Sequence, residues 1–373
     1  MKILRVVHRL YPPKVGGLSF YAHLISAEQA RVGHRVVALT SREGSYPKHE
    51  IRDGYEIFRF QALGWPLDNP ITLGILEQLL GNRDCDIVNA HSHLMFTTNL
   101  AALKRKLSDV PLVITNHGFR VERGSVENRA QDLYLRSVGR WVLTAADYVI
   151  SFTHSERNKV ISAGVSPAKA LVIPNGVDTG LFRPEPCEPI PGSVVWTGRF
   201  VAEKGLPYLL KAARLVVDEI PESKFIIVGY GGELPRLLDL RQQLRLEDHV
   251  AFPGPMSQQE IVTLLNRCTV LALPSLSEGF PSSVLEAMAC AKPVVVTSGI
   301  GLEEIVENAG IYTQPANPHA LADAIKKILR DPGLAIELGK RGRRRVIDHY
   351  DWRKIVSSVN ELFERAIRER STS

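Results

Sequence analysis

Short apolar runs alternate with longer amphipathic stretches along most of this chain. In the first half, the β-rich runs predict strands and the stretches of helical spacing predict helices. Strands are expected at Ile3–Val7, Arg35–Thr40, Ile57–Phe60, Asp86–Ala90, Leu112–Thr115, Tyr148–Ser151 and Leu171–Ile173, and helices at Leu18–Val32, Phe96–Leu107, Val126–Ala145 and Ser155–Ala163. Such alternation is typical of an α/β protein with a parallel sheet.

A proline-rich run, Arg183–Gly192, interrupts this alternation with four prolines. Because such a run fits neither helix nor sheet, we interpret it as an interdomain linker. The pattern then restarts. Strands are expected at Ser193–Trp196, Phe225–Val228, Val250–Phe252, Val270–Leu273 and Val294–Val296, and helices at Leu206–Asp218, Leu234–Leu244, Gln258–Asn266, Ser282–Ala289, Pro318–Leu329, Leu334–Asp348 and Trp352–Ile367.

The length of 373 residues also favours two domains. We expect two facing Rossmann-like domains, 1–187 and 188–352, with a cleft between them. Ligands of open α/β sheets bind outside the carboxyl ends of the strands, and the polar motifs described below mostly follow predicted strands.

The composition is ordinary for a soluble globular protein, with 45% hydrophobic and 23% charged residues. No apolar run reaches the ~18–20 residues of a membrane span. The start, Met1–His8, is too short and too interrupted by charge for a signal peptide. The four cysteines have no metal-like spacing. We therefore expect a cytoplasmic protein with free thiols.

Positive charge is concentrated in the first half: residues 1–186 carry 23 basic and 17 acidic side chains, and the remainder is balanced. This favours an anionic partner, either a phosphorylated small molecule or an anionic membrane surface, unless the surface is simply solvated. The helix Val126–Ala145 carries Arg129, Arg136 and Arg140 among apolar residues. It forms either a membrane-surface face or a buried apolar stripe with solvated arginines.

Two glutamates frame the most informative stretch, Pro274–Cys290. Glu278 lies in a Gly/Pro/Ser loop, and Glu286 lies in the first turn of the helix that follows. Carboxylates accept hydrogen bonds from hydroxyls, and N–H groups at a helix N-terminus favour anions. The stretch therefore suits a nucleotide sugar. Alternatively, Ser283 and Glu286 form a capping box and Glu278 is a solvated loop residue.

Arg199 and Lys204 lie five residues apart in the loop after the strand Ser193–Trp196. Two fixed cations in one loop can hold a diphosphate and stabilise negative charge as it leaves. The alternative is a solvated loop in which Glu203 pairs with one of them. Farther along, Gly229–Gly232 follows another strand and is expected to form a wall of the nucleotide pocket.

In the first half, Gly16 and Gly17 follow the first strand, where glycines let backbone N–H groups approach a phosphate. The dinucleotide motif Gly-x-Gly-x-x-Gly is absent, and an ordinary strand–helix turn is the alternative. His117 ends another strand, where it can orient or polarise a sugar or serve as a buried structural histidine.

His91 and His93 also follow a strand, but no carboxylate or cysteine completes a metal site, so we interpret them as cleft lining. Asp84-Cys85-Asp86 has the form of an Asp-x-Asp metal motif. It precedes a strand, at the wrong edge of the sheet for the cleft, so we discount it.

Together these residues resemble the retaining nucleotide-sugar glycosyltransferases of family four, which have the GT-B fold. The resemblance covers nearly the whole chain. It is strongest from Pro174–Asp178 through Gly198–Gly205 to Glu278–Glu286, and the other motifs follow in the expected order.

The resemblance implies a role for each residue. Arg199 and Lys204 would hold the donor diphosphate, Glu286 would bind the ribose, Glu278 would lie near the donor sugar, and His117 would contact that sugar. The other donor-binding residues that it implies are Gly16, Gly17, Gly279, Phe280, Pro281, Val284 and Leu285. It also implies no metal or cofactor, and a C-terminal helix at about 353–370 that completes the first domain.

We therefore expect transfer of a sugar from a nucleoside-diphosphate sugar to a hydroxyl acceptor, with retained anomeric configuration. A front-face path is favoured, because no residue is an obvious covalent nucleophile. The acceptor is expected to be a sugar, polyol or lipid-linked molecule, with peripheral association at the anionic inner membrane face as an option and no nucleic acid. A non-hydrolysing sugar-nucleotide epimerase and a nucleotide-sugar-binding protein without turnover remain as alternatives.

Overall fold

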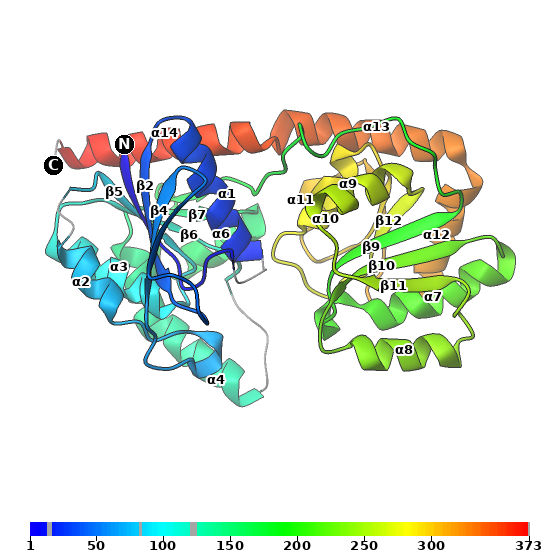
Figure 1. Ribbon diagram of the computed structural model, residues 1–373, viewed down its shortest axis with the longest axis horizontal. Helices are drawn as coiled ribbons and strands as arrows, with labels where there is room; N and C mark the ends of the chain where they lie inside the picture. Colours follow the sequence, from blue (N-terminus) through cyan, green and yellow to red (C-terminus); the bar gives the residue numbers. More distant parts are fainter. Residues whose placement is uncertain (13–16, 82–83, 120–124, 372–373) are drawn as a thin grey trace. The chain divides into compact units, whose positions relative to one another are not determined.

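The computed structural model describes residues 1–12, 17–81, 84–119 and 125–371. The chain forms two compact units. Met1–Asn175 and Ile355–Ser373 make up the first, and Gly176–Lys354 makes up the second. Each unit has a parallel sheet of its own with helices packed around it (Figure 1).

The first unit contains an eight-stranded sheet in the order β3-β4-β2-β1-β5-β6-β7-β8, whose pairs are parallel apart from β3–β4. Its strands are β1 (Lys2–Val6), β2 (Arg35–Ser41), β3 (His49–Arg52), β4 (Tyr55–Phe60), β5 (Ile87–His91), β6 (Leu112–Thr115), β7 (Tyr148–Ser151) and β8 (Ala170–Val172). Its helical segments are α1 (Gly17–Arg31), η1 (Pro66–Asp68), α2 (Gly74–Gly81), α3 (Phe96–Leu107), α4 (Ser125–Tyr134), the π-helical η2 (Leu135–Gly139), α5 (Arg140–Ala145) and α6 (His154–Ser162).

The second unit contains a six-stranded, all-parallel sheet in the order β11-β10-β9-β12-β13-β14. Its strands are β9 (Ser193–Arg199), β10 (Lys224–Tyr230), β11 (Val250–Gly254), β12 (Val270–Leu273), β13 (Val294–Thr297) and β14 (Gly310–Thr313). Its helices are η3 (Ala202–Lys204), α7 (Leu206–Glu219), α8 (Leu234–Gln243), α9 (Gln258–Arg267), α10 (Ser282–Ala289), α11 (Glu303–Val306), α12 (Pro318–Arg330) and α13 (Pro332–His349), followed by α14 (Trp352–Ser371).

The central strands are buried on both faces. Every residue of β5, β6, β7, β12 and β13 is buried. Helices cover both faces of a parallel sheet, so such strands are continuous apolar runs in the sequence rather than alternating ones. This is why the apolar runs located these strands correctly.

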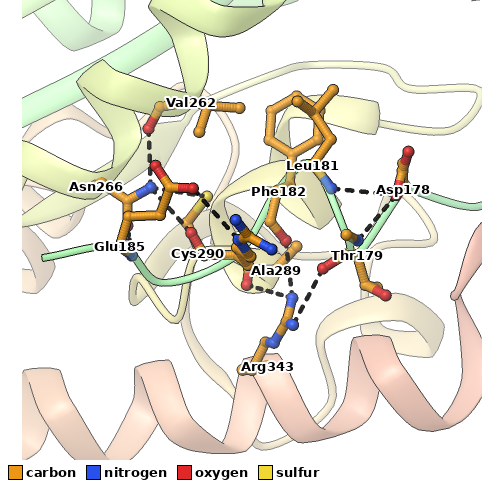
Figure 2. A network of polar contacts seen from close by, with 12 residues as sticks. Asp178, Thr179, Leu181, Phe182, Glu185, Val262, Asn266, Ala289, Cys290 and Arg343 are labelled. Carbon is orange, nitrogen blue, oxygen red and sulfur yellow. Dashed lines mark hydrogen bonds and ion pairs between the residues drawn. The ribbon is translucent and has the colours of Figure 1, made fainter.

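The proline-rich segment expected to be a linker packs against the second unit instead (Figure 2). Asn266 donates from Nδ2 to the carbonyl oxygen of Arg183 at 3.0 Å and accepts from the backbone N–H of Glu185 at 2.9 Å. Arg343 donates to the carbonyl oxygens of Phe182 and Ala289, at 2.8 Å each. Hydrogen bonds with side-chain amide and guanidinium groups thus take the place of the strand pairing that the backbone of this segment lacks. The units divide at residues 175 and 176, upstream of the expected boundary at 187.

The C-terminal helix α14 belongs to the first unit from Ile355 onward. Phe363 is fully buried, Gln29 donates to Asn360 at 2.7 Å, and the hydroxyl of Tyr148 donates to Glu369 at 2.7 Å. Among the described residues, no helix has both the length and the apolar character needed to cross a bilayer.

Candidate functional site

The candidate site of the second unit lies at the carboxyl ends of two neighbouring strands. β9 and β12 pair at the centre of the sheet, where the order of the strands reverses. Ligands of open α/β sheets bind at such a switch point. Arg199 ends β9, and the loop with Glu278 follows β12. The structure therefore brings the predicted cations and glutamates to one edge of this sheet.

Lys204 reaches this edge because its loop passes directly over the end of β12. Gly205 follows it with a φ of 67°, and a Cβ at this position would lie 2.1 Å from the carbonyl oxygen of Pro274. Only glycine accommodates both the conformation and the contact. A backbone hydrogen bond of 2.7 Å from Leu276 to Glu203 joins the same two loops. The glycine thus fixes how closely Lys204 approaches the Glu278 loop.

Lys204 and Glu278 form a bidentate ion pair. Nζ of Lys204 lies 2.7 Å from both carboxylate oxygens, and Oγ of Ser275 donates to one of them at 2.6 Å. The Glu278 side chain is only 4% exposed, so its interpretation as a solvated loop residue is wrong. An ammonium has three N–H donors. With two of them directed at the carboxylate, one remains for an oxygen of a ligand.

Arg199 differs from Lys204 in having no partner among the described residues. Its side chain is exposed, and within the described ranges its guanidinium makes no hydrogen bond or ion pair. The alternative in which Glu203 pairs with it is therefore not what the structure shows. A guanidinium that presents five unused donors at the end of a central strand is suited to an anionic ligand with several oxygens.

Glu286 lies one turn into α10 and is partly buried. Burial raises the pKa of its carboxyl to about 7. In the described part of the chain no side chain donates to this carboxylate or forms an ion pair with it, so nothing offsets the desolvation. A partly buried, unpartnered acceptor next to a helix N-terminus is suited to hydroxyl groups of a ligand.

The N-terminus of α10 has no cap of its own. The helix begins at Ser282, Pro281 is the N-cap residue, and no side chain accepts from the first N–H groups. The capping-box interpretation of Ser283 and Glu286 is therefore wrong. The first turn of a helix leaves N–H groups without intrahelical partners, and these favour an anion.

The other predicted donor-binding residues of this segment differ in exposure. Gly279 is exposed, Phe280 is partly buried and Pro281 is buried. Val284 and Leu285 are fully buried and belong to the core of the second unit. Their side chains are therefore core side chains, and the backbone N–H of Val284 already donates to the carbonyl oxygen of Pro281.

The loop after β10 packs against the loop that carries Arg199. A Cβ at Gly231, whose φ is 154°, would lie 2.3 Å from the carbonyl oxygen of Phe200. A Cβ at Gly229 would likewise lie 1.8 Å from the carbonyl oxygen of Gly198, so side chains are excluded at both positions. The expectation that they form a wall of a nucleotide pocket stays a prediction.

In the first unit, His117 lies at the end of β6 among other rings. Its Nε2 is hydrogen-bonded to Nδ1 of His91 at 2.9 Å, and its ring meets those of Tyr21 and Phe152 with centroids 5.1 Å and 5.0 Å away. Burial, with a smaller contribution from His8, lowers the pKa of His117 to about 3. The imidazole is therefore neutral near pH 7.

His91 and His93 are fully buried. Burial lowers the pKa of His93 to about 4 and the pKa of His91 well below its usual value. His93 is hydrogen-bonded to Asn116 at 3.1 Å. Among the residues that the structure describes, no group of three or more His, Cys, Asp or Glu side chains forms a candidate metal site. The expectation of no metal or cofactor stays a prediction.

The two remaining motifs of the first unit lie at opposite edges of its sheet. Gly17 is the exposed first residue of α1, whereas Gly16 falls outside the described residues. Asp84 pairs with the Lys2 side chain, and Asp86 accepts from the Lys2 backbone at 2.7 Å, where β1 begins. The Asp-x-Asp motif thus lies at the amino edge, as the sequence indicated.

Comparisons with known proteins fit this geometry. The family model for Glycosyltransferase Family 4 matches residues 15–181, and that for glycosyl transferases group 1 matches 191–345. Over 307 residues the chain is 31% identical to the D-inositol 3-phosphate glycosyltransferase of Acidothermus cellulolyticus, which covers 76% of this chain and 68% of the relative. The chain belongs to glycosyltransferase family 4.

Solved structures show which fold this family-4 glycosyltransferase has. Sucrose-phosphate synthase from Thermosynechococcus elongatus superimposes with a TM-score of 0.80 at 24% identity, over 99% of this chain and 100% of that one. Anabaena HepE in complex with UDP gives a TM-score of 0.80 at 22% identity, over 98% and 100%. The expected GT-B architecture of two parallel-sheet α/β domains is confirmed.

One residue of the candidate site was missed in the sequence. Ser275 is fully buried and orients Glu278 through its hydroxyl. A serine three residues before a glutamate in a loop is a known local hydrogen-bonding pattern, so the spacing held a signal. The sequence could not show, however, that this glutamate is buried and needs support.

Proposed function

We propose that this glycosyltransferase moves a sugar from a nucleoside-diphosphate sugar to a hydroxyl acceptor with retention of anomeric configuration. The observation that carries the proposal is the group of Arg199, Lys204, Glu278 and Glu286 at one edge of the second sheet. Two cations suit a diphosphate, and two carboxylates suit hydroxyls.

In the proposed reaction, the bond between the sugar C1 and the phosphate oxygen breaks while the acceptor oxygen bonds to C1 on the same face. The leaving diphosphate takes the proton of the acceptor hydroxyl, so no separate base is needed. Arg199, the remaining N–H of Lys204 and the N-terminus of α10 stabilise the negative charge that develops on the diphosphate.

Glu278 has a positioning part in this mechanism. Both of its oxygens are engaged by Lys204 and one by Ser275. A carboxylate neutralised in this way is a poor nucleophile, which supports the front-face path over a covalent intermediate. Its remaining lone pairs accept from a hydroxyl of the donor sugar, as the family resemblance implies.

Similar proteins support a nucleotide-sugar donor and leave several classes of acceptor open. Anabaena HepE is described in complex with UDP-glucose. Other relatives are named as D-inositol 3-phosphate, phosphatidylinositol monomannoside and glycogen enzymes. We propose a phosphorylated polyol or lipid-linked acceptor, because the excess basic charge lies in residues 1–186.

Donor-dependent release of nucleoside diphosphate tests the proposal. Thermal shifts with UDP-, GDP- and ADP-sugars first identify the donor. Release that requires an acceptor supports transfer, and isomerisation of the donor sugar without any acceptor supports the epimerase. Donor binding with neither reaction, across an acceptor panel of inositol phosphates and lipid-linked sugars, would contradict the proposal. A trapped sugar–enzyme adduct would contradict the front-face path.

A further inference from the structure

The helical segment from α4 to α5 exposes large apolar side chains on the first unit. Leu133, Val138 and Trp141 are 70%, 40% and 38% exposed. Val142 and Leu143, on the other side, are fully buried. The segment thus has an inner apolar face that packs and an outer one that does not. In Figure 1, α4 is at the lower end of the first unit, far from α14.

The π-helical turn η2 aligns these outer side chains. In an uninterrupted α-helix, Val138 would point about 140° away from Leu133, because each residue advances about 100°. In a π turn, residues five apart lie one above the other. Trp141 then follows Val138 by three residues, which is the spacing of neighbours on one α-helical face.

Specific contacts hold this turn in place. Tyr134 anchors the inner face, because its hydroxyl lies within hydrogen-bonding distance of the carbonyl oxygen of His93 at 3.0 Å and of Oδ1 of Asn99 at 2.7 Å. The hydroxyl of Ser137 donates to the carbonyl oxygen of Leu133 at 2.7 Å. A Cβ at the buried Gly139 would lie 3.2 Å from both the ring and the carbonyl oxygen of Tyr134. The outward alignment is therefore a built feature of the segment.

Three arginines accompany the apolar side chains. Arg129, Arg136 and Arg140 are exposed, and they join Leu133 in a row with steps of three and four residues. None of the three makes an ion pair with another described residue. We call the outer side of this segment the arginine–apolar face; it consists of Arg129, Leu133, Arg136, Val138, Arg140 and Trp141.

A helix of the second unit provides the contrast. α13 also exposes two large apolar residues, Ile336 at 58% and Ile347 at 40%. Its two exposed arginines, however, pair with acids one turn away: Arg341 with Glu337 and Arg344 with Asp348. Exposed apolar residues among neutralised charges need no partner. The arginine–apolar face differs because none of its arginines forms an ion pair with a described residue.

We propose that the arginine–apolar face docks this protein on an anionic phospholipid surface. Leu133, Val138 and Trp141 enter the boundary between headgroups and acyl chains, where tryptophan is favoured. The arginines meet the negative charge of the headgroups. This partner satisfies both features of the face at once, whereas a hydrophobic protein surface would leave three arginines unpaired. The inference does not depend on the transfer reaction, because binding is measured without donor or acceptor.

Co-sedimentation of the full chain with vesicles tests the proposal. Binding to phosphatidylcholine vesicles that contain phosphatidylglycerol is expected, with weak binding to phosphatidylcholine alone and a loss of binding as salt is raised. Leu133→Ser with Trp141→Ser should lower partitioning about tenfold or more. Arg136→Gln and Arg140→Gln should each lower it about fivefold. Donor-dependent turnover with a soluble acceptor should not change in these variants.

Ile336→Ser with Ile347→Ser is the matched control and should bind vesicles like the wild type. Equal binding by the wild type and the Leu133/Trp141 variant would overturn the proposal, as would no binding to either vesicle. Concentration-dependent self-association that the Leu133/Trp141 variant abolishes, without vesicle binding, would also overturn it and assign the face to a second copy. Circular dichroism and thermal melts identify variants that fail to fold.

Discussion

The carboxyl edges of the two sheets have opposite chemistry. In the second unit, the edge carries an exposed arginine, a bidentate lysine–glutamate pair and an uncapped helix N-terminus. In the first unit, the corresponding edge holds neutral imidazoles enclosed by aromatic rings. A diphosphate needs fixed charge, whereas a sugar hydroxyl needs a neutral donor or acceptor. The edge of the second sheet thus suits an anionic group, and the edge of the first sheet suits neutral polar groups.

Lys204→Ala should have the largest effect. It removes a cation from the proposed diphosphate site and leaves the nearly buried carboxylate of Glu278 without its ion-pair partner. We expect a loss of turnover of about two to three decades, together with a loss of about 3 kcal/mol of unfolding free energy. Kinetics and urea denaturation measure the two effects. In the double variant Lys204→Ala/Glu278→Ala, stability should partly return while activity stays low; a double variant as unstable as Lys204→Ala would contradict this account of the pair.

Arg199→Ala should cause a similar loss of turnover without the loss of stability. The side chain is exposed and has no partner among the described residues, so its removal should change the unfolding free energy by less than about 0.5 kcal/mol. A stable variant with near wild-type turnover would remove Arg199 from the site.

His91→Leu should have a moderate effect on activity. Both rings are neutral, so one donates and the other accepts in the bond between His91 and His117, and this couples the tautomers of the two rings. Loss of this bond should lower kcat about tenfold. His93→Leu is the matched control, because His93 is equally buried but bonds to Asn116 instead. If both variants lower kcat equally, His91 has no positioning role.

The smallest expected effect is on how the free energy of unfolding depends on pH. This dependence has opposite signs in the two units. The pKa of Glu286 is about 7 in the folded chain, against an ordinary value of 4.5. The unfolded chain therefore loses this proton first as pH rises, and stability falls between pH 4.5 and 7. Glu286→Gln should raise the unfolding free energy by about 2 kcal/mol at pH 8 and by less than about 1 kcal/mol at pH 5. Denaturant curves at both pH values measure the gain.

The buried histidines of the first unit have the opposite effect: their contribution to stability rises with pH. Their folded pKa values, about 3 for His117 and about 4 for His93, lie below the ordinary 6.5. The unfolded chain binds protons first as pH falls, so their contribution is complete above pH 6.5 and is lost below it. For Glu286, an increase in unfolding free energy on substitution with Gln that is the same at pH 5 and pH 8 would contradict the raised pKa of its carboxyl.

Much of the fold was readable in the sequence, because both sheets are parallel and their central strands are apolar runs. The hairpin β3–β4 was missed although its signal is present. Asp53 and Gly54 both have positive φ, at 47° and 83°, and Asp-Gly is a strong signal for a two-residue turn. β14 and α11 were missed because they are only four residues long and carry little periodicity.

The sequence gathered the residues of the candidate site, but it could not show the contacts among them. The motifs located Arg199, Lys204, Glu278 and Glu286 after strands that the structure confirms. The pairing of Lys204 with Glu278 joins residues 74 positions apart and depends on the close approach at Gly205. The linker interpretation failed for a similar reason, because Asn266 and Arg343 hold that segment from distant helices (Figure 2).

The central claim is that the second unit grips the diphosphate of its donor through Arg199. Isothermal titration calorimetry tests this claim most directly. UDP, GDP, ADP and the three corresponding nucleosides are each titrated into the wild type and into Arg199→Ala. For the nucleotide that binds most tightly, we predict at least about a tenfold loss of affinity in the variant and an unchanged affinity for the nucleoside. Equal affinity of the wild type and Arg199→Ala for every nucleoside diphosphate would contradict the claim.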